Sequence, residues 1–364
     1  MNGTGKVQIS YREAISLLTV SSVFSSITFS LRENMTLCPM SYMIAFALGV
    51  AFIFLLILPY FLLMKRYGGM SVLDCSYRLF GKFSVVFALA FFLFLCGVGA
   101  KCVSEFDAFL LNEVFPDASP FIIIALLVLA CAYGAFLGIE ALGRFANLVF
   151  FFTCFSVLLI LISLLGKFDL LNFGITQKEE IDTVFMQSFR YAASNPELIT
   201  VLLIAPVVNK KLRKGFALWN LLALILVEGI AFSVIGTLGD YAQVQLYPYY
   251  RAATVAEMSV LKRLDAAHLC VWILVAFTKI TYYLLLAKNV LDTVIRKSAK
   301  KFSLIVSAML LFVLSVLTVF GSEFAKNFGE LLLSPYVIFS AVVFFPLILW
   351  VVSLAKGDRL HEKD

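Results

Sequence analysis

Glu197 and Lys279 are the two residues of this sequence whose chemistry stands out, because each lies within a long apolar segment. Glu197 follows Asn195 and Pro196 in the stretch RYAASNPELITVLLIAP, and Lys279 lies in WILVAFTKITYYLLLAK. An ionisable side chain in such a segment needs a charged partner, a proton or a polar cavity. Lys279 can therefore occupy a cation site, pair with Glu197 or titrate, with Tyr282 nearby in the sequence. Pure structural pairing is the alternative.

The Asn195–Pro196 pair predicts that the segment around Glu197 is broken into two helices. A residue before proline is disfavoured in the α region, while Asn suits an N-cap and proline suits the first helical position. A new helix is therefore expected to begin here, with Tyr191 and Ser194 in the half before it. Unwound backbone within a membrane requires surrounding protein or a wet cavity. An ordinary proline kink is the alternative.

Two earlier apolar segments supply further candidates for a ligand site. Lys101 and Glu105 lie four residues apart, so on a helix they form an internal ion pair or line a cavity together. The first apolar segment is rich in serine, which either contacts a ligand or only permits close helix packing. Its candidate residues are Ser21, Ser22, Ser25 and Ser26.

Residue types that are typical of catalytic and metal sites are scarce in this sequence. It contains only 2 His, and its 7 Cys show no CxxC or Cys/His spacing of the kind that binds metals. It also lacks a nucleophile elbow and a phosphate loop. We therefore expect no enzymatic activity, no metal and no other cofactor.

The apolar segments are long and numerous enough for an all-α, polytopic membrane protein. The chain is 62% hydrophobic and 14% charged, whereas soluble domains are about half apolar and about a quarter charged. A membrane helix needs roughly 20 apolar residues, and hydropathy indicates about ten spans. They are expected at 11–31, 40–64, 83–112, 119–137, 141–166, 184–208, 214–238, 266–293, 302–321 and 331–355.

The charges of the connecting segments predict how these spans are oriented. The connections after the second, sixth and eighth spans are rich in Lys and Arg, whereas NEVFPDASP has neither. Because basic loops stay on the cytoplasmic side, both termini are predicted to be cytoplasmic, with a tail at 356–364. The tyrosines of the segment 240–265 suit the outer membrane interface.

Ten spans divide into two sets of five, 11–166 and 184–355, within a single transmembrane domain, 1–364. Since five is odd, the two sets have opposite orientation, which predicts an inverted repeat in which helices 1 and 6 correspond and both are discontinuous. Such folds bind their ligand near the midplane, here between helices 1, 3, 6 and 8. A helix N-terminus favours a carboxylate and Glu197 can accept an ammonium group, so a small amino acid suits the site.

Three stretches of the sequence resemble the B subunits of spore-germination nutrient receptors, a branch of the amino acid/polyamine/organocation transporter superfamily. They are GIEALGRFANLVF, PELITVLLIAPVVNKK, and YPYY followed by LKRLDAAHLCVWILVAFTKI, in matching order along nearly the whole chain. The resemblance singles out Glu140 and Arg144 at a cytoplasmic junction between helices 4 and 5, together with Glu197 and Lys279. The chain departs from it in helix 1, which lacks the usual glycine or proline, and at Pro196, where glycine is usual.

The resemblance implies a receptor subunit of the inner spore membrane that binds a small nutrient such as an amino acid. It would signal to a larger A-type membrane subunit and a C-type lipoprotein. The alternative is a secondary transporter that moves an amino acid with H⁺ or a cation and uses Glu197 or Lys279 as the titrating group. A third possibility is an assembly scaffold whose polar residues only pair with one another.

Overall fold

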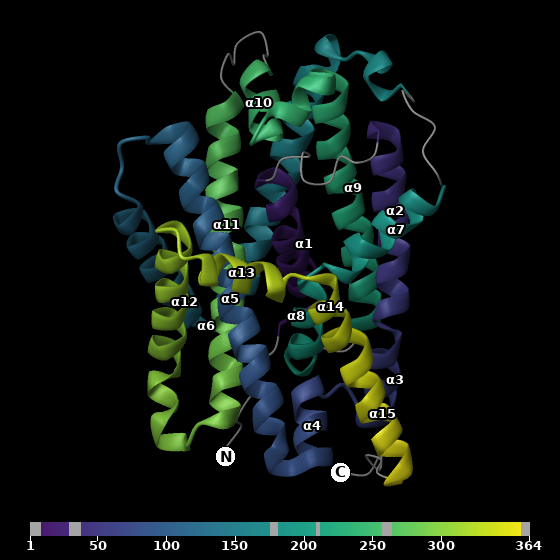
Figure 1. The fold of residues 1–364 in the computed structure, drawn as a ribbon, viewed down its shortest axis with the longest axis vertical. Coiled ribbons are helices and arrows are strands. Elements are labelled where there is room, and N and C mark those ends of the chain that lie inside the picture. Colours follow the sequence, from purple (N-terminus) through teal and green to yellow (C-terminus); the bar gives the residue numbers. More distant parts are fainter. Residues whose placement is uncertain (1–8, 29–37, 175–180, 209–211, 257–263, 358–364) are drawn as a thin grey trace.

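The computed structural model describes residues 9–28, 38–174, 181–208, 212–256 and 264–357, and nearly all of them are helical (Figure 1). The longer helices are α1 (Tyr11–Thr28), α2 (Pro39–Leu56), α5 (Ser84–Phe109), α6 (Pro120–Leu164), α9 (Leu212–Leu238), α11 (Leu264–Val294) and α12 (Ser303–Val319). The shorter ones are α3 (Leu58–Tyr67), α4 (Val72–Phe80), α7 (Ile181–Ala193), α8 (Glu197–Ile204), α10 (Pro248–Val255), α13 (Glu323–Leu332), α14 (Pro335–Phe339) and α15 (Phe345–Ala355). β pairing in the described ranges is limited to a bridge between Ile9 and Val208.

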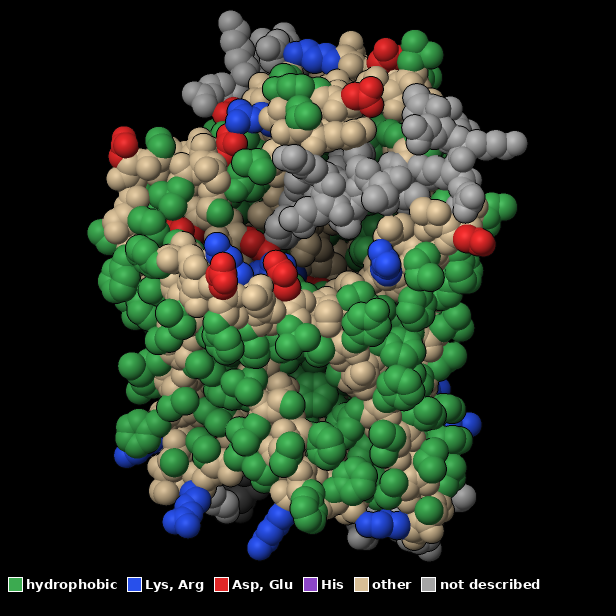
Figure 2. Space-filling view, in the orientation of Figure 1, with side chains coloured by type: hydrophobic (Ala, Val, Ile, Leu, Met, Phe, Trp, Pro, Cys, Tyr) green, Lys and Arg blue, Asp and Glu red, His purple; other side chains and the backbone are tan. Residues whose placement is uncertain are grey.

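Seven helical runs among the described residues are long and apolar enough to cross a membrane. They are Pro39–Tyr67, Val72–Val114, Pro120–Lys167, Leu212–Val244, Leu264–Val294, Ser298–Val319 and Pro335–Ala355. Figure 2 shows a broad belt of hydrophobic side chains around the lower part of the molecule, with Lys and Arg at its lower edge. The predicted all-α membrane class is therefore confirmed. The inverted repeat, the two sets 11–166 and 184–355, and the orientation of the termini stay predictions.

The ten predicted spans and these seven runs differ at three places. The first span, α1, begins with Arg12 and Glu13 and is rich in serine, so it is less apolar than the seven runs. The sixth is split into α7 and α8, each short. The fourth and fifth are joined in α6, which contains Gly138 at φ 88° and ψ 177°.

The chain folds back at Gly138, so the two parts of α6 lie side by side on α11. Cys131 approaches the carbonyl oxygen of Phe277, and the ring of Phe145 lies 5.4 Å from the ring of the same residue. On a straight helix, residues 14 positions apart would be separated by about 21 Å. Both parts can contact Phe277 only because the left-handed φ of Gly138 reverses the chain.

The prediction that helix 1 is discontinuous is wrong for its described part, since α1 is an unbroken α-helix from Tyr11 to Thr28. Two of its hydroxyl groups bond within the helix: Ser22 donates to the carbonyl of Leu18 at 2.9 Å and Thr28 to that of Phe24 at 2.7 Å. Neither glycine nor proline is present to open the backbone. The remainder of the predicted span, 29–31, lies outside the described residues.

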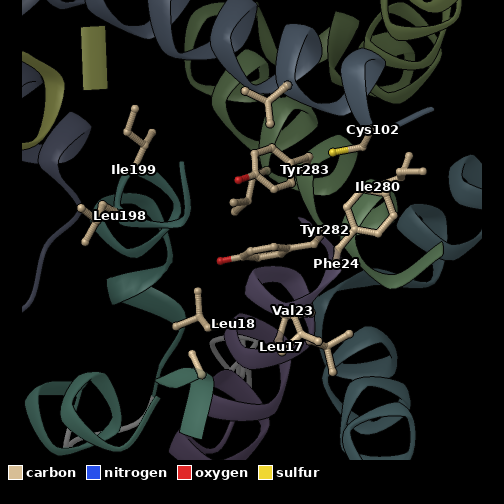
Figure 3. Packing of buried hydrophobic residues seen from close by; sticks show 14 of the residues in the cluster. Leu17, Leu18, Val23, Phe24, Cys102, Leu198, Ile199, Ile280, Tyr282 and Tyr283 are labelled. Atoms are coloured by element: carbon tan, nitrogen blue, oxygen red, sulfur yellow. The ribbon is translucent and has the colours of Figure 1, made fainter. Parts of the chain in front are cut away.

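The core is built around α11, which packs against α1, α5, α6 and α12. Figure 3 shows part of it, where Tyr282 and Tyr283 of α11 lie among apolar side chains of α1 and α8, including Leu18 and Leu198. All four of these side chains are fully buried or nearly so. The site described below depends on this packing because it fixes α1, α8 and α11 relative to one another.

Gly134 permits the close contact between α6 and α11, and we expect Gly134→Ala to destabilise the protein by about 1–3 kcal/mol. A Cβ atom there would lie 2.9 Å from both Phe277 Cζ and Thr281 Cγ2. Gly329→Ala in α13 is the matched control, since a Cβ there meets open space and alanine favours the helix. Unfolding of the purified protein in detergent should show opposite signs for the two changes; equal effects would contradict the close-packing explanation.

Three of the four tyrosines expected at the membrane interface are instead buried in the fold, whereas Tyr241 is 58% exposed and its interfacial position stays a prediction. Tyr249 and Tyr250 belong to α10, and Tyr249 is 1% exposed. Helix α10 is held against the helical turn that follows α5, Leu110–Val114, by an ion pair between Arg251 and Glu113, with Nη2 and Oε2 2.8 Å apart. These tyrosines therefore cover the bundle at the end that carries α10 (Figure 1).

Candidate functional site

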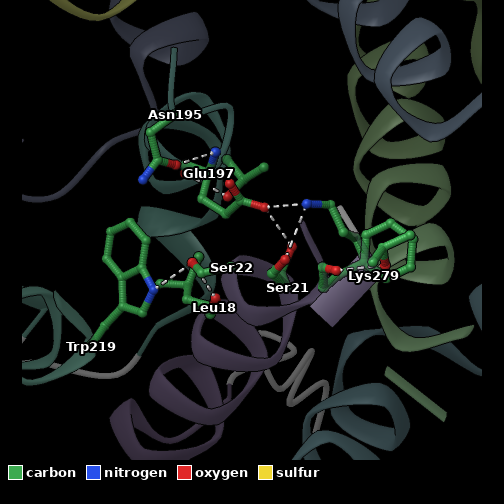
Figure 4. Close-up of polar contacts among 10 residues, drawn as sticks. Leu18, Ser21, Ser22, Asn195, Glu197, Trp219 and Lys279 are labelled. Atoms are coloured by element: carbon green, nitrogen blue, oxygen red, sulfur yellow. Dashed lines mark hydrogen bonds and ion pairs between the residues drawn. The ribbon is translucent and has the colours of Figure 1, made fainter. Parts of the chain in front are cut away.

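The predicted break between α7 and α8 is confirmed. Helix α7 ends at Ala193, and α8 starts at Glu197 after three residues that are not helical. The side-chain Oδ1 of Asn195 accepts a hydrogen bond from the backbone N–H of Glu197 at 3.0 Å, so Asn195 caps α8 as its residue type predicts. The cap places the Glu197 side chain in the first turn of a helix inside the bundle, where it is buried (Figure 4).

Glu197 and Lys279 form a buried ion pair that α1 completes. Lys279 Nζ lies 2.8 Å from Glu197 Oε1 and also donates to the carbonyl oxygen of Ser21 at 3.0 Å. The hydroxyl of Ser21 donates to the same Glu197 oxygen at 2.9 Å. The two charged side chains are 4% and 2% exposed. One carboxylate, one ammonium group and one serine thus join α8, α11 and α1, as Figure 4 shows.

Aromatic rings complete the surroundings of the ammonium group. The Nζ atom of Lys279 lies 5.5 Å from the centre of the Phe24 ring and 5.8 Å from that of Tyr283. Rings at this distance attract a cation through their faces. The ammonium group is therefore held by a carboxylate, a backbone carbonyl and two rings, which fixes its position. The structure shows Lys279 paired with Glu197, which is one of its three predicted roles.

Beside this pair lie two adjoining spaces of about 320 and 470 Å³, here together called the central cavity. Seven residues line both spaces: Ser25, Ser26, Tyr42, Phe46, Tyr191, Ser194 and Pro196. Ligand sites for small molecules commonly have about this volume, 300–1,000 Å³. Figure 2 shows a hollow near mid-height on one face, with acidic and basic side chains gathered around it.

Most of the predicted ligand residues face the central cavity. Lys101 and Glu105 line one of its spaces together with Lys279, and Ser22, Asn195 and Glu197 line the other. The Nζ of Lys101 and the Oε1 of Glu105 are 3.9 Å apart, so this predicted pair is loose and the Lys101 side chain remains 36% exposed. Ser21 contacts Glu197 and does not line the cavity. The ligand role of all these residues stays a prediction.

Three other predicted residues lie away from the central cavity. Tyr282 is fully buried in the core among apolar side chains (Figure 3). Glu140 and Arg144 are exposed and follow the Gly138 turn of α6. This position agrees with a junction between two spans, although it gives these two residues no contact with the central cavity.

Several residues that line the central cavity were not predicted as ligand residues. Tyr42 and Phe46 belong to α2 and Arg190 to α7. Tyr249 contributes a buried hydroxyl that has no hydrogen-bond partner among the described residues, and burial raises the pKa of this phenol above its usual value. It therefore remains a neutral donor at the edge of the cavity. The only sequence feature that pointed to Tyr249 was the YPYY motif.

A packed layer closes the central cavity toward the end of the molecule that carries α4. It consists of 198–202 in α8 and 280–284 in α11, whose residues are at most 1% exposed. Five helical residues span about 7 Å. Beyond the layer a separate cavity begins at Leu203 and Leu285. A ligand in the central cavity is thus shielded on this side.

Groups of His, Cys, Asp or Glu that could hold a metal ion are absent from the described part of the chain. The charged groups near the central cavity instead suit an organic ligand that carries charge of both signs. Lys101 and Arg190 supply positive charge, Glu105 supplies negative charge, and Glu197 with Lys279 is neutral as a pair.

Comparison with known proteins gives three findings that agree with this geometry. The sequence profile of a family described as "Spore germination protein" matches residues 8–322. The chain is 25% identical over 291 residues to "Spore germination protein KB" of Bacillus subtilis (strain 168), covering 77% of this chain and 78% of that protein. Its fold is similar to that of a Na⁺-coupled sialic acid symporter in a substrate-bound, outward-open state. That match has a TM-score of 0.60 and 14% identity, and it covers 95% of this chain and 88% of the symporter.

Proposed function

Since the chain belongs to the spore germination protein family, we propose that it is the nutrient-binding membrane subunit of a germinant receptor. The observation that carries this proposal is the central cavity, which lies at the break between α7 and α8. A cavity at a broken helix inside a transporter-like bundle is where such folds bind their ligands. The family supports a role in germination, and the cavity is the proposed site for the nutrient.

The proposed ligand is a small amino acid. Its carboxylate would lie toward Lys101 or Arg190, and its ammonium group toward Glu105 or Glu197. Hydroxyl groups of Ser25, Ser26 and other lining residues offer further hydrogen bonds. An uncharged ligand would leave these groups without the charge complementarity that they provide.

Binding is proposed to act on α8, because this helix begins at the cavity and carries Glu197. A ligand that contacts the start of α8 in only one arrangement of the helices favours that arrangement. The change would pass to a larger A-type membrane subunit and a C-type lipoprotein in the inner spore membrane. Both termini are proposed to face the cytoplasm, at the end that carries α4.

Transport of an amino acid is the second candidate function, favoured by the packed layer with a cavity on either side. Alternating access requires two such cavities and a layer that can open between them. Uptake of labelled amino acid against a gradient into proteoliposomes, lost in Glu197→Gln, would establish transport and overturn the pure receptor function. Binding without uptake would support the receptor.

We expect at least one amino acid to raise the unfolding temperature of the purified protein, and Ser26→Phe to weaken that binding at least tenfold. Ser26 is half-buried and lines both spaces of the central cavity, so a phenyl ring there takes the room of the ligand. A ligand at 100 times its Kd stabilises the folded state by about 2.7 kcal/mol. The measurement is thermal unfolding across a panel of amino acids.

The matched control is Ser163→Phe in α6, a half-buried helical serine that lines neither space of the central cavity. It should bind like the unmodified protein. Unfolding temperatures that no amino acid changes would contradict the proposal and favour a scaffold. If both serine variants bound the amino acid equally well, the binding site would lie outside the central cavity.

A further inference from the structure

A second cavity, here called the basal cavity, lies on the other side of the packed layer. Its volume is about 770 Å³, larger than either space of the central cavity. Helices α4, α6, α8, α11 and α12 all contribute to its walls. Neither the predicted nutrient site nor the ion pair makes use of it.

One side of the basal cavity is basic. Lys300 and Lys301 line it just before α12, both are exposed, and among the described residues neither has a carboxylate within ion-pair distance. Lys288 also lines it but pairs with Asp292 at 2.8 Å. The acidic residue of the lining, Asp74, is engaged by the hydroxyl of Ser71 at 2.7 Å. The ammonium groups of Lys300 and Lys301 thus have no carboxylate partner among the described residues, although that of Lys301 lies 4.9 Å from the ring of Phe302, and both can bind an anion.

The interior of the basal cavity is apolar and deep. Leu285, Leu286 and Val290 of α11 face it together with Ile204 of α8, and all four are at most 4% exposed. From Leu285 to Thr293 the wall formed by α11 extends about 12 Å. Phe136, which also lines the cavity, is 74% exposed, so the cavity reaches the apolar outer surface of the bundle.

We propose that the basal cavity binds an anionic phospholipid. The phosphate lies between Lys300 and Lys301, and one acyl chain lies along α11 toward Leu285. Basic pockets between membrane helices recognise lipid headgroups in this way. A free phosphate ion would satisfy the two lysines but would leave the deep apolar part without a partner, so charge and shape together favour a lipid.

The bound acyl chain would touch the end of the helix that begins at the ion pair. Ile204, Pro206 and Val207, at the end of α8 and in the turn that follows, all line the basal cavity. A lipid here would oppose any movement of this end of α8 into the basal cavity. The proposal does not depend on the nutrient site, since it concerns the opposite side of the packed layer.

The test measures lipid binding to the full-length protein in detergent by native mass spectrometry and by thermal unfolding. We expect phosphatidylglycerol to bind at least tenfold more tightly than phosphatidylcholine with the same acyl chains. Lys300→Ala/Lys301→Ala should weaken phosphatidylglycerol binding on the order of ten- to thirtyfold. Both lysines are exposed, so this variant should fold normally.

Lys65→Ala/Lys214→Ala is the matched control, because it removes two exposed lysines that line neither cavity, and it should bind phosphatidylglycerol unchanged. Ala135→Phe, which fills the apolar wall, should weaken the binding of both lipids. Equal binding of the two lipids, or equal loss in both lysine variants, would overturn the proposal. Competition by inorganic phosphate as strong as that by the lipid would assign a free-anion site instead.

Discussion

Lys279→Met is expected to lower the free energy of unfolding by about 3–5 kcal/mol, because it leaves the Glu197 carboxylate buried without its cation. Methionine retains most of the side-chain length, so the loss reports the charge and not a large cavity. In the native protein the ammonium group bonds both to Glu197 and to the carbonyl of Ser21. Unfolding in mixed detergent micelles, followed by circular dichroism, measures the change.

The double variant Glu197→Gln/Lys279→Met tests whether the loss comes from the unpaired charge. It removes both charges, so we expect it to be more stable than Lys279→Met alone, with at least half of the loss recovered. Lys101→Met is the matched control: the Lys101–Glu105 pair is 3.9 Å long and partly exposed, and such pairs contribute about 0–1 kcal/mol. Equal losses of unfolding free energy in the two lysine variants would show that the buried pair stabilises the protein no more than the partly exposed pair.

The break before Glu197 was predictable because it depends on local chemistry alone. Asn195 caps a helix and Pro196 excludes the preceding residue from one, so these two adjacent residues are enough to fix the result. The pairing of Glu197 with Lys279 was predictable only as one of several roles, since the two residues are 82 positions apart. Their distance depends on how α8 packs on α11, which the sequence does not state directly.

Helix 1 shows why a polar composition is a weak sign of a broken helix. Its serines suggested an unwound segment, but serine can bond to the carbonyl four residues earlier and remain helical. Ser22 does so, and its oxygen also accepts a hydrogen bond from Trp219 at 3.0 Å. A break requires a residue that excludes the helix, as Pro196 does, and the described part of α1 has none.

The rest of the central cavity could not be predicted because its walls come from distant parts of the chain. Tyr42 belongs to α2, Arg190 to α7 and Tyr249 to α10, and none of these residues has a local pattern that marks a ligand site. Tyr249 had a pattern that indicated the membrane interface. Its burial against His268, with the rings 4.9 Å apart, depends on where α10 folds over the bundle.

Trp272→Ala is expected to cost about 3–5 kcal/mol of stability and to abolish nutrient binding, because Trp272 joins three of the helices around the central cavity. Its ring in α11 stacks on Phe106 of α5 at 4.8 Å and packs on Phe109 at 4.2 Å. It also stacks on Phe24 of α1 at 6.4 Å, and its Nε1 donates to Thr28 Oγ1 at 2.9 Å. Thermal unfolding with and without the amino acid measures both effects.

Two further variants separate the contribution of the Trp272 ring from that of its hydrogen bond, and from the general effect of removing a tryptophan. Trp272→Phe keeps most of the stacking and loses the bond to Thr28, so a loss of about 1–2 kcal/mol is expected. Trp350→Ala in α15 removes a half-buried tryptophan far from α1 in the sequence and should leave nutrient binding intact.

Ser25 and Ser26 directly follow Phe24, so loosening α1 here displaces a wall of the central cavity. If Trp272→Ala bound the amino acid normally, the position of α1 would not determine the site.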